Sequence, residues 1–151
     1  ATRRYLLADE VGLGKTIEAG ALIWQCLHDQ PDARILILAP DHLRRQWAAE
    51  LTERFRVDEF ADSWLRVRAH SDPGSWPTEP VDLLVVDEAY GQFAEWSAMG
   101  LVDDDTPLAI TRTFSKTWSM AAARLGYLVG PRWVVAELEK VTKGIKMPGI
   151  L

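Results

Sequence analysis

The chain has 151 residues, of which 48% are hydrophobic and 26% are charged, a composition that excludes a disordered or fibrous protein. Lys and Arg number 17 against 22 Asp and Glu, and the formal net charge of −5 argues against a protein that mainly coats nucleic acid. The single cysteine, Cys26, excludes an internal disulfide framework and fits a cytoplasmic protein. No apolar run reaches membrane-spanning length, so no membrane partner is expected.

The first part of the chain predicts strands that alternate with helices. Tyr5–Ala8 is a short apolar strand, and Thr16–Asp29 has apolar residues at helical spacing. Ile35–Ala39 is uniformly apolar, as expected of a strand buried on both faces. Asp41 is placed to cap the next helix. Every fourth residue gives that helix an apolar face: Leu43, Trp47, Leu51 and Phe55.

The second part predicts more strands and a final helix. Residues 57–80 are rich in proline and form a predicted loop with a short strand around Leu65–Val67. A helix is expected to begin at Pro131, and residues 144–151 form a tail. Three further strands are predicted, at Leu83–Val86, Leu108–Thr111 and Tyr127–Val129. This alternation predicts one α/β domain over residues 1–151, a three-layer sandwich around a mainly parallel sheet.

A glycine-bearing loop joins the first predicted strand to the first predicted helix. Gly12 and Gly14 would let backbone amides surround a polyphosphate at the positive end of the helix. Lys15 would contact the outer phosphates, and Thr16 would ligate Mg²⁺. This spacing predicts an ATP-binding site, with Lys15 as one of its catalytic residues.

The string LLADEVGLGKTIEAG, followed by ILILAP and LRRQWAAEL, resembles the Swi/Snf-type DNA-dependent ATPases of helicase superfamily two over about residues 3–56, so residues 1–80 are the ATPase-like part. The resemblance implies that Asp87 would hold Mg²⁺ and that Glu88 would position or deprotonate the attacking water. It also implies DNA as a partner. Tyr90 replaces the family's histidine and the family's second lobe has no counterpart, so at most weak ATP hydrolysis and no translocation are expected.

The strings LLVVDEAYGQFAEWSA and LAITRTFSKTWSMAAARLGYLVGP resemble the central part of histidinol-phosphate-type class I/II aminotransferases, over residues 81–143. This second resemblance implies pyridoxal phosphate as the cofactor. The positions that it assigns are Asp87 for the pyridinium nitrogen, Tyr90 for the phenolic oxygen, Lys116 for the Schiff base, and Ser115 and Arg124 for the phosphate.

The two resemblances meet in residues 83–89, which fit both families, so we expect a composite chain. In such ATPases the strand before Gly12–Thr16 lies between the Asp87 strand and the strand after it. In the aminotransferases the Asp87 and Lys116 strands are neighbours. We expect the ATPase arrangement, because residues 3–56 form a complete local unit, and in either case these loops should lie beyond the carboxyl ends of the strands.

Three functions are open at this point. The first is nucleotide binding, the second is pyridoxal phosphate binding, and the third is a non-catalytic fold that acts only by binding a protein. Several arginines are spread along the sequence and are expected on solvated faces: Arg3, Arg4, Arg44, Arg45, Arg66 and Arg68.

Overall fold

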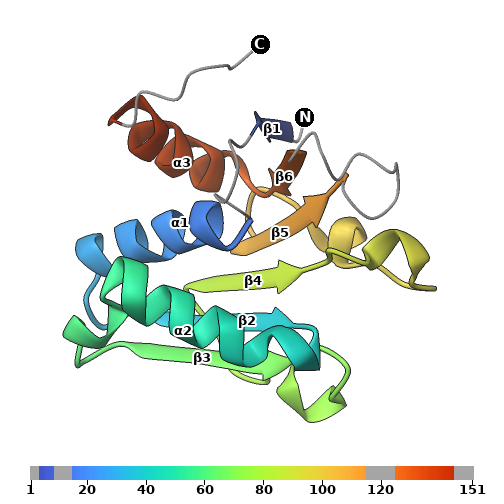
Figure 1. Ribbon diagram of the computed structural model, residues 1–151, viewed down its shortest axis with the longest axis horizontal. Coiled ribbons are helices and arrows are strands. Elements are labelled where there is room, and N and C mark those ends of the chain that lie inside the picture. The colour runs from blue at the N-terminus through green and yellow to red at the C-terminus, as the bar shows by residue number, and fades with distance from the viewer. Residues whose placement is uncertain (1–3, 9–14, 115–124, 145–151) are drawn as a thin grey trace.

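The computed structural model describes residues 4–8, 15–114 and 125–144, and within these ranges six strands form one sheet (Figure 1). The strands are β1 (Arg4–Ala8), β2 (Arg34–Ala39), β3 (Trp64–Ala69), β4 (Leu83–Asp87), β5 (Leu108–Thr113) and β6 (Leu125–Val129). The helices are α1 (Lys15–Asp29), α2 (Arg44–Phe55) and α3 (Arg132–Gly144). Every strand and helix that the sequence predicts is present, with bounds that differ by a few residues.

The strand order is β1-β6-β5-β4-β2-β3. Strands β2, β3, β4 and β5 pair in parallel, whereas β6 is antiparallel to both β5 and β1. The expectation of an α/β fold with a mainly parallel sheet is therefore confirmed. The expected ATPase arrangement is wrong, because β1 lies at the outer edge beside β6 instead of between β4 and β5.

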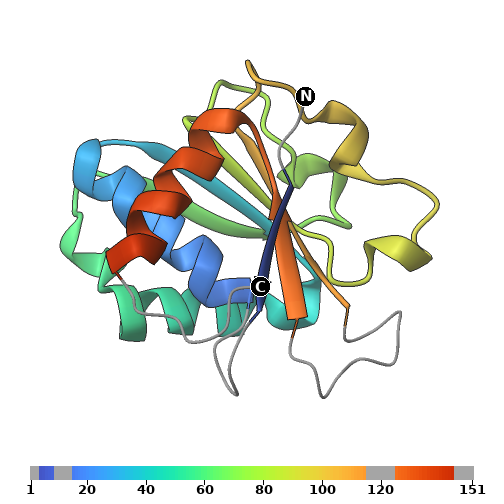
Figure 2. The same cartoon turned by 90° about the horizontal axis from the view of Figure 1, so that it is seen from above.

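The two faces of the sheet are covered differently (Figure 2). All three helices cover one face, where α1 residues such as Leu22 and α2 residues such as Trp47 share a core with Ile35 and Val85. The other face, which carries Leu36 and neighbouring apolar residues, is covered in the described residues by loops and single-turn 3-10 helices. Within residues 4–8, 15–114 and 125–144 the expected three-layer sandwich is therefore not formed, since the helices of these ranges cover one side of the sheet.

The apolar face predicted for α2 is confirmed, since Trp47 and Leu51 are each 1% exposed. Asp41 does not cap α2, however, because residues Asp41–Leu43 form a 3-10 turn between β2 and the helix. The side chain of Asp41 instead accepts a hydrogen bond from the Arg44 guanidinium at 2.8 Å. The inserted turn moves the start of α2 three residues beyond the predicted cap.

Candidate functional site at the carboxyl edge of the sheet

The register of the strands brings the ends of β1, β4 and β5 and the start of β6 to the carboxyl edge of the sheet, where the parallel strands end. Ala8, the last residue of β1, pairs with Leu125, the first residue of β6. Thr113, the last residue of β5, pairs with Gly126, and Asp87 at the end of β4 pairs with Thr111. The ends of β1, β4 and β5 and the start of β6 therefore share this edge, which is the usual ligand-binding edge of a parallel sheet.

Asp87 is the central polar group of this edge and is 2% exposed. Its Oδ2 accepts a hydrogen bond from the indole Nε1 of Trp47 at 3.0 Å. Its Oδ1 accepts one from the backbone N–H of Ala89 at 3.0 Å and a longer one, 3.4 Å, from the hydroxyl of Thr111. Donors on α2, β5 and its own loop thus hold the carboxylate in a fixed orientation.

Trp47 was not predicted as a partner of Asp87, because the two residues are 40 positions apart in the chain. The helical spacing placed Trp47 in the core, and its indole N–H was the remaining signal. A buried indole nitrogen needs an acceptor, although the pattern of apolar residues does not say which one.

The carboxylate of Glu88 has none of the hydrogen-bond donors of Asp87 named above. Its Oε2 accepts hydrogen bonds from the guanidinium of Arg112 at 2.7 and 3.1 Å, and its Oε1 accepts one from the backbone N–H of Ala98 at 2.6 Å. The hydroxyl of Ser97 donates to the same carboxylate, and the Glu88 and Arg112 side chains are 8% and 14% exposed. Glu88 is therefore one half of a buried ion pair, and its role as the group that activates water stays a prediction.

Asp87 and Glu88 line a cavity of about 440 Å³ beside the end of β4. Its wall includes several aromatic rings, among them that of Tyr90, which is 42% exposed and meets His42 edge to face, with ring centroids 6.4 Å apart. The volume is within the range of small-molecule sites. The other residues that line the cavity include His70, Trp76 and Trp96.

The remaining predicted site residues are only partly covered by the structure. Gly12 and Gly14 lie outside the described residues, as do Ser115, Lys116 and Arg124. The backbone of α1 begins at Lys15, so Thr16 lies in the first helical turn.

Thr16 and Asp87, the predicted magnesium ligands, lie on two different elements, the start of α1 and the end of β4. No group of three or more His, Cys, Asp or Glu residues that could hold a metal occurs in the part of the chain that the structure describes. The predicted Mg²⁺ ligands therefore stay a prediction.

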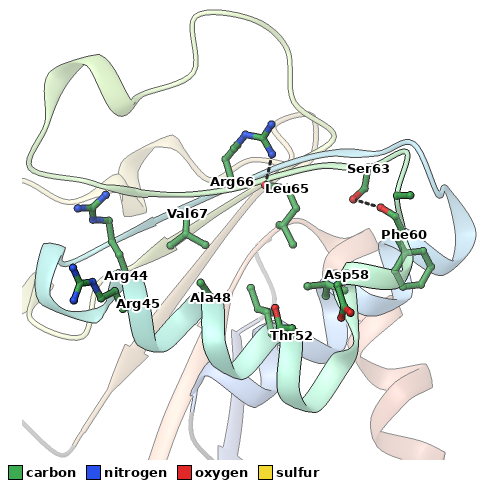
Figure 3. A pocket seen from close by; sticks show the side chains of 13 residues that line it. Arg44, Arg45, Ala48, Thr52, Asp58, Phe60, Ser63, Leu65, Arg66 and Val67 are labelled. Atoms are coloured by element: carbon green, nitrogen blue, oxygen red, sulfur yellow. Dashed lines mark hydrogen bonds between the residues drawn. The ribbon is translucent and has the colours of Figure 1, made fainter.

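A second, larger cavity, with a volume of about 620 Å³, lies between α2 and β3 (Figure 3). Strand β3 is the outermost strand on the side of the sheet away from β1. Arg44 and Arg45 lie at the start of α2 at one end of it, and Arg66 on β3 bends back so that its guanidinium donates to the carbonyl of Leu65 at 2.9 Å. Arg44, Arg45 and Arg66 are exposed, as the sequence predicts.

Two family models match the chain, one before β4 and one that includes β4 and the elements after it. The model described as SNF2-related domain matches residues 2–78, more than half of the chain. The model described as Aminotransferase class I and II matches residues 82–150. The RNA polymerase-associated protein RapA of Proteus mirabilis is 53% identical over 62 residues, which is 40% of this chain and 6% of that protein. The composite organisation that the sequence predicts is confirmed.

The similar solved structures are aminotransferase-like. The L-threonine-O-3-phosphate decarboxylase of Porphyromonas gingivalis superimposes with a TM-score of 0.57 at 14% identity, over 91% of this chain and 49% of that protein. The histidinol-phosphate aminotransferase of Sinorhizobium meliloti, solved in complex with pyridoxal-5'-phosphate, gives 0.53 at 18% identity, over 91% and 44%. These matches extend across both halves of the chain, whereas the chain spans about half or less of each protein. None of the described helices is long and apolar enough to cross a membrane.

Proposed function

We propose that this chain, which belongs to the SNF2-related domain family through residues 2–78, binds pyridoxal phosphate at the carboxyl edge of β4 and β5. Its sheet has the order β1-β6-β5-β4, which differs from the arrangement expected of an ATPase and makes β4 and β5 neighbours. The observation that carries this proposal is the direct pairing of β4 with β5. That pairing brings Asp87 to the edge from which the segment with Lys116 departs.

Asp87 and Tyr90 suit the ring of this cofactor. The Asp87 carboxylate is buried, is held by uncharged donors on three sides, and lines a cavity whose wall includes several aromatic rings, which favours a flat cationic ring over a hydrated metal ion. Asp87 would accept the hydrogen bond of the pyridinium N–H, and Tyr90, in the same cavity, would contact the phenolic oxygen. When bound, pyridoxal phosphate supplies an electron-accepting ring, and a carboxylate at its nitrogen keeps that ring protonated.

Lys116, Ser115 and Arg124 would complete the site from the connection between β5 and β6. Lys116 follows Thr113 by three residues, a stretch of chain that reaches at most about 10 Å from the end of β5. Thr113 is itself two residues beyond Thr111, the register partner of Asp87. Lys116 is thus within reach of a ligand on Asp87, as its proposed covalent attachment requires.

A second candidate function is Mg²⁺-dependent nucleotide binding with at most weak hydrolysis. It is favoured by the 53% identity to RapA over 62 residues and by the SNF2-related match, whose residues 2–78 contain the GLGKT loop. Here Lys15 would contact the phosphates of ATP, together with the amides of Gly12 and Gly14. Thr16 and Asp87 would hold the Mg²⁺ that accompanies ATP. DNA and RNA polymerase as partners, and a cytoplasmic location, stay proposals.

A parallel binding experiment separates the two functions. We expect pyridoxal phosphate to bind the purified chain, and borohydride reduction with peptide mapping to place the label on Lys116. Arg124→Ala should abolish this label. Labelling of Lys140, an exposed residue on α3 that serves as the internal control, should be weak and unaffected by Arg124→Ala. Equal labelling of Lys116 and Lys140 would refute the cofactor site.

The variant Asp87→Asn distinguishes the two ligands further. If Asp87 holds a pyridinium nitrogen, the substitution weakens pyridoxal phosphate binding to the same extent with and without Mg²⁺. If Asp87 ligates Mg²⁺, the substitution weakens ATP binding only when Mg²⁺ is present. Lys15→Ala should weaken ATP binding at least about tenfold by removing a charge-assisted phosphate contact. A Lys15→Ala chain that binds ATP like the parent would remove the second candidate.

A further inference from the structure

Three arginines surround one tryptophan on the face of the sheet opposite the helices. Trp64 is the first residue of β3, and Arg66 and Arg68 follow at two-residue spacing, so all three share one face. Arg34 is the register partner of Trp64 on β2. The guanidinium carbons of Arg34, Arg66 and Arg68 lie 4.9, 5.2 and 5.9 Å from the Trp64 ring centroid. Three positive charges are thus concentrated around one ring.

These charges are only partly balanced by neighbouring groups. Among the described residues, the one ion pair that reaches this cluster joins Arg34 to Glu79 at 2.9 Å, and the Glu79 side chain is 72% exposed. The Nε of Arg34 is buried and has no hydrogen-bond partner. A buried donor without an acceptor costs free energy. The Arg34 side chain as a whole is 42% exposed, so its other N–H groups are accessible to an incoming anion.

A cavity of about 360 Å³ opens onto this cluster, and Arg34 and Arg68 line it together with Trp64 and Trp76. The Trp76 indole is fixed in place, because its Nε1 donates to the carbonyl of His70 at 3.4 Å and its ring meets that of Trp96 edge to face. The cavity therefore combines guanidinium groups that suit a phosphate with indole rings that suit a flat aromatic group.

We propose that this cavity binds a nucleotide, with its phosphate on Arg34 and Arg68 and its base against the tryptophan rings. The chemistry is that of one nucleoside monophosphate unit, either free or within a single strand of nucleic acid. Bare phosphate would leave the indole walls unused, and an uncharged aromatic would leave the arginines unbalanced. The cavity shares Trp76 with the cavity beside β4, but it contains none of the residues that would bind pyridoxal phosphate directly and none of the GLGKT loop, so its arginines can be tested separately from the proposed function.

Binding of adenosine monophosphate without Mg²⁺, followed by tryptophan fluorescence and calorimetry, tests this proposal. Arg34→Gln and Arg68→Gln should each weaken binding about tenfold, because each removes a charge-assisted hydrogen bond to phosphate. The matched control is Arg45→Gln, which removes the same charge from the exposed surface of α2 and should leave the affinity unchanged. Lys15→Ala and Asp87→Asn should also leave it unchanged, so failure here is distinguishable from failure of the proposed function.

Two more ligands, an oligonucleotide and inorganic phosphate, show whether the site takes a free nucleotide, a single strand or neither. A ten-residue oligodeoxyadenylate that binds more tightly than the monophosphate, with an affinity that falls steeply with salt, would assign the site to single strands. Equal affinity per nucleotide would assign it to the free nucleotide. Inorganic phosphate that binds as tightly as the monophosphate, or an Arg45→Gln variant as weak as Arg68→Gln, would refute the proposal. Melting temperatures exclude misfolding, and Arg68→Gln keeps the test valid if Arg34→Gln unfolds.

Discussion

Neutralising Glu88 in its ion pair with Arg112 should destabilise the fold. The sequence motif indicates a catalytic role for Glu88, whereas its contacts indicate a structural one. Glu88→Gln keeps the size of the side chain, and its amide oxygen can still accept from the backbone N–H of Ala98. Its amide nitrogen would then face the Arg112 guanidinium, which is a donor as well. The substitution therefore leaves a cation that is 14% exposed without its carboxylate.

The expected cost follows from that burial. Breaking a buried pair by neutralising one partner typically costs about 3–5 kcal/mol, a large part of the 5–15 kcal/mol that stabilises an ordinary domain. Burial acts to lower the pKa of Arg112, but hydrogen bonds to Glu88 and Tyr127 outweigh it and raise that pKa above its ordinary value. In the variant the guanidinium still keeps its charge, because arginine does not lose its proton in proteins. For a chain of this length, we expect the melting temperature to fall by roughly 10 °C.

Urea unfolding followed by tryptophan fluorescence measures the effect, with Arg112→Met and the double variant completing a thermodynamic cycle. We expect the double variant to be more stable than the sum of the two single losses, because it leaves no unpaired buried charge. The structural role would be refuted if the free energy of unfolding of Glu88→Gln lay within about 1 kcal/mol of the parent value. If that variant had also lost ATP hydrolysis, the catalytic role of Glu88 would be restored.

Three further predictions concern the core. Trp47→Phe removes the indole donor to Asp87 and should lower the free energy of unfolding by about 1.5–3 kcal/mol in urea, whereas an unchanged value would show the bond to be dispensable. Gly20→Ala places a methyl group into the Phe55 ring and should cost about 1–3 kcal/mol in the same assay, against a gain in helix propensity if the ring can move. Burial, followed by nearby carboxylates, raises the pKa of the Cys26 thiol to about 11, so its alkylation at pH 8 should be about 100-fold slower than in the unfolded chain. Because the folded pKa is the higher one, the free energy of unfolding should fall as pH rises above about 9, and a rise would contradict the assignment.

Local patterns were sufficient to predict the strands and helices, since apolar runs such as Ile35–Ala39 and the spacing of Trp47 and Leu51 depend on near neighbours in the chain. The pairing of strands could not be predicted in this way. Residues 3–56 contain a complete ATPase-like unit, yet β1 pairs with β6, because the antiparallel return of the chain after β5 places β6 between β5 and β1.

In the candidate site, too, local motifs could be predicted from the sequence, whereas contacts between distant residues could not. The sequence identified Asp87 and Tyr90, because an acidic residue and a tyrosine after a buried strand are visible as a motif. It did not identify Arg112, which is 24 residues from Glu88, nor the approach of Arg34 to Trp64 across two strands. These contacts depend on register, which is fixed only when the whole sheet assembles.

The strand order has a consequence for how this composite chain folds. The aminotransferase-like strands β6, β5 and β4 lie in the middle of the sheet, with the ATPase-like strand β1 on one side and β2 and β3 on the other. A cut near residue 80 would therefore expose both edges of the central strands and would detach β1 from β2. Closing β1 onto β6 joins residues as distant as Arg4 and Val129. Contacts between such distant residues slow folding, so we expect this chain to fold more slowly than a domain built from local contacts.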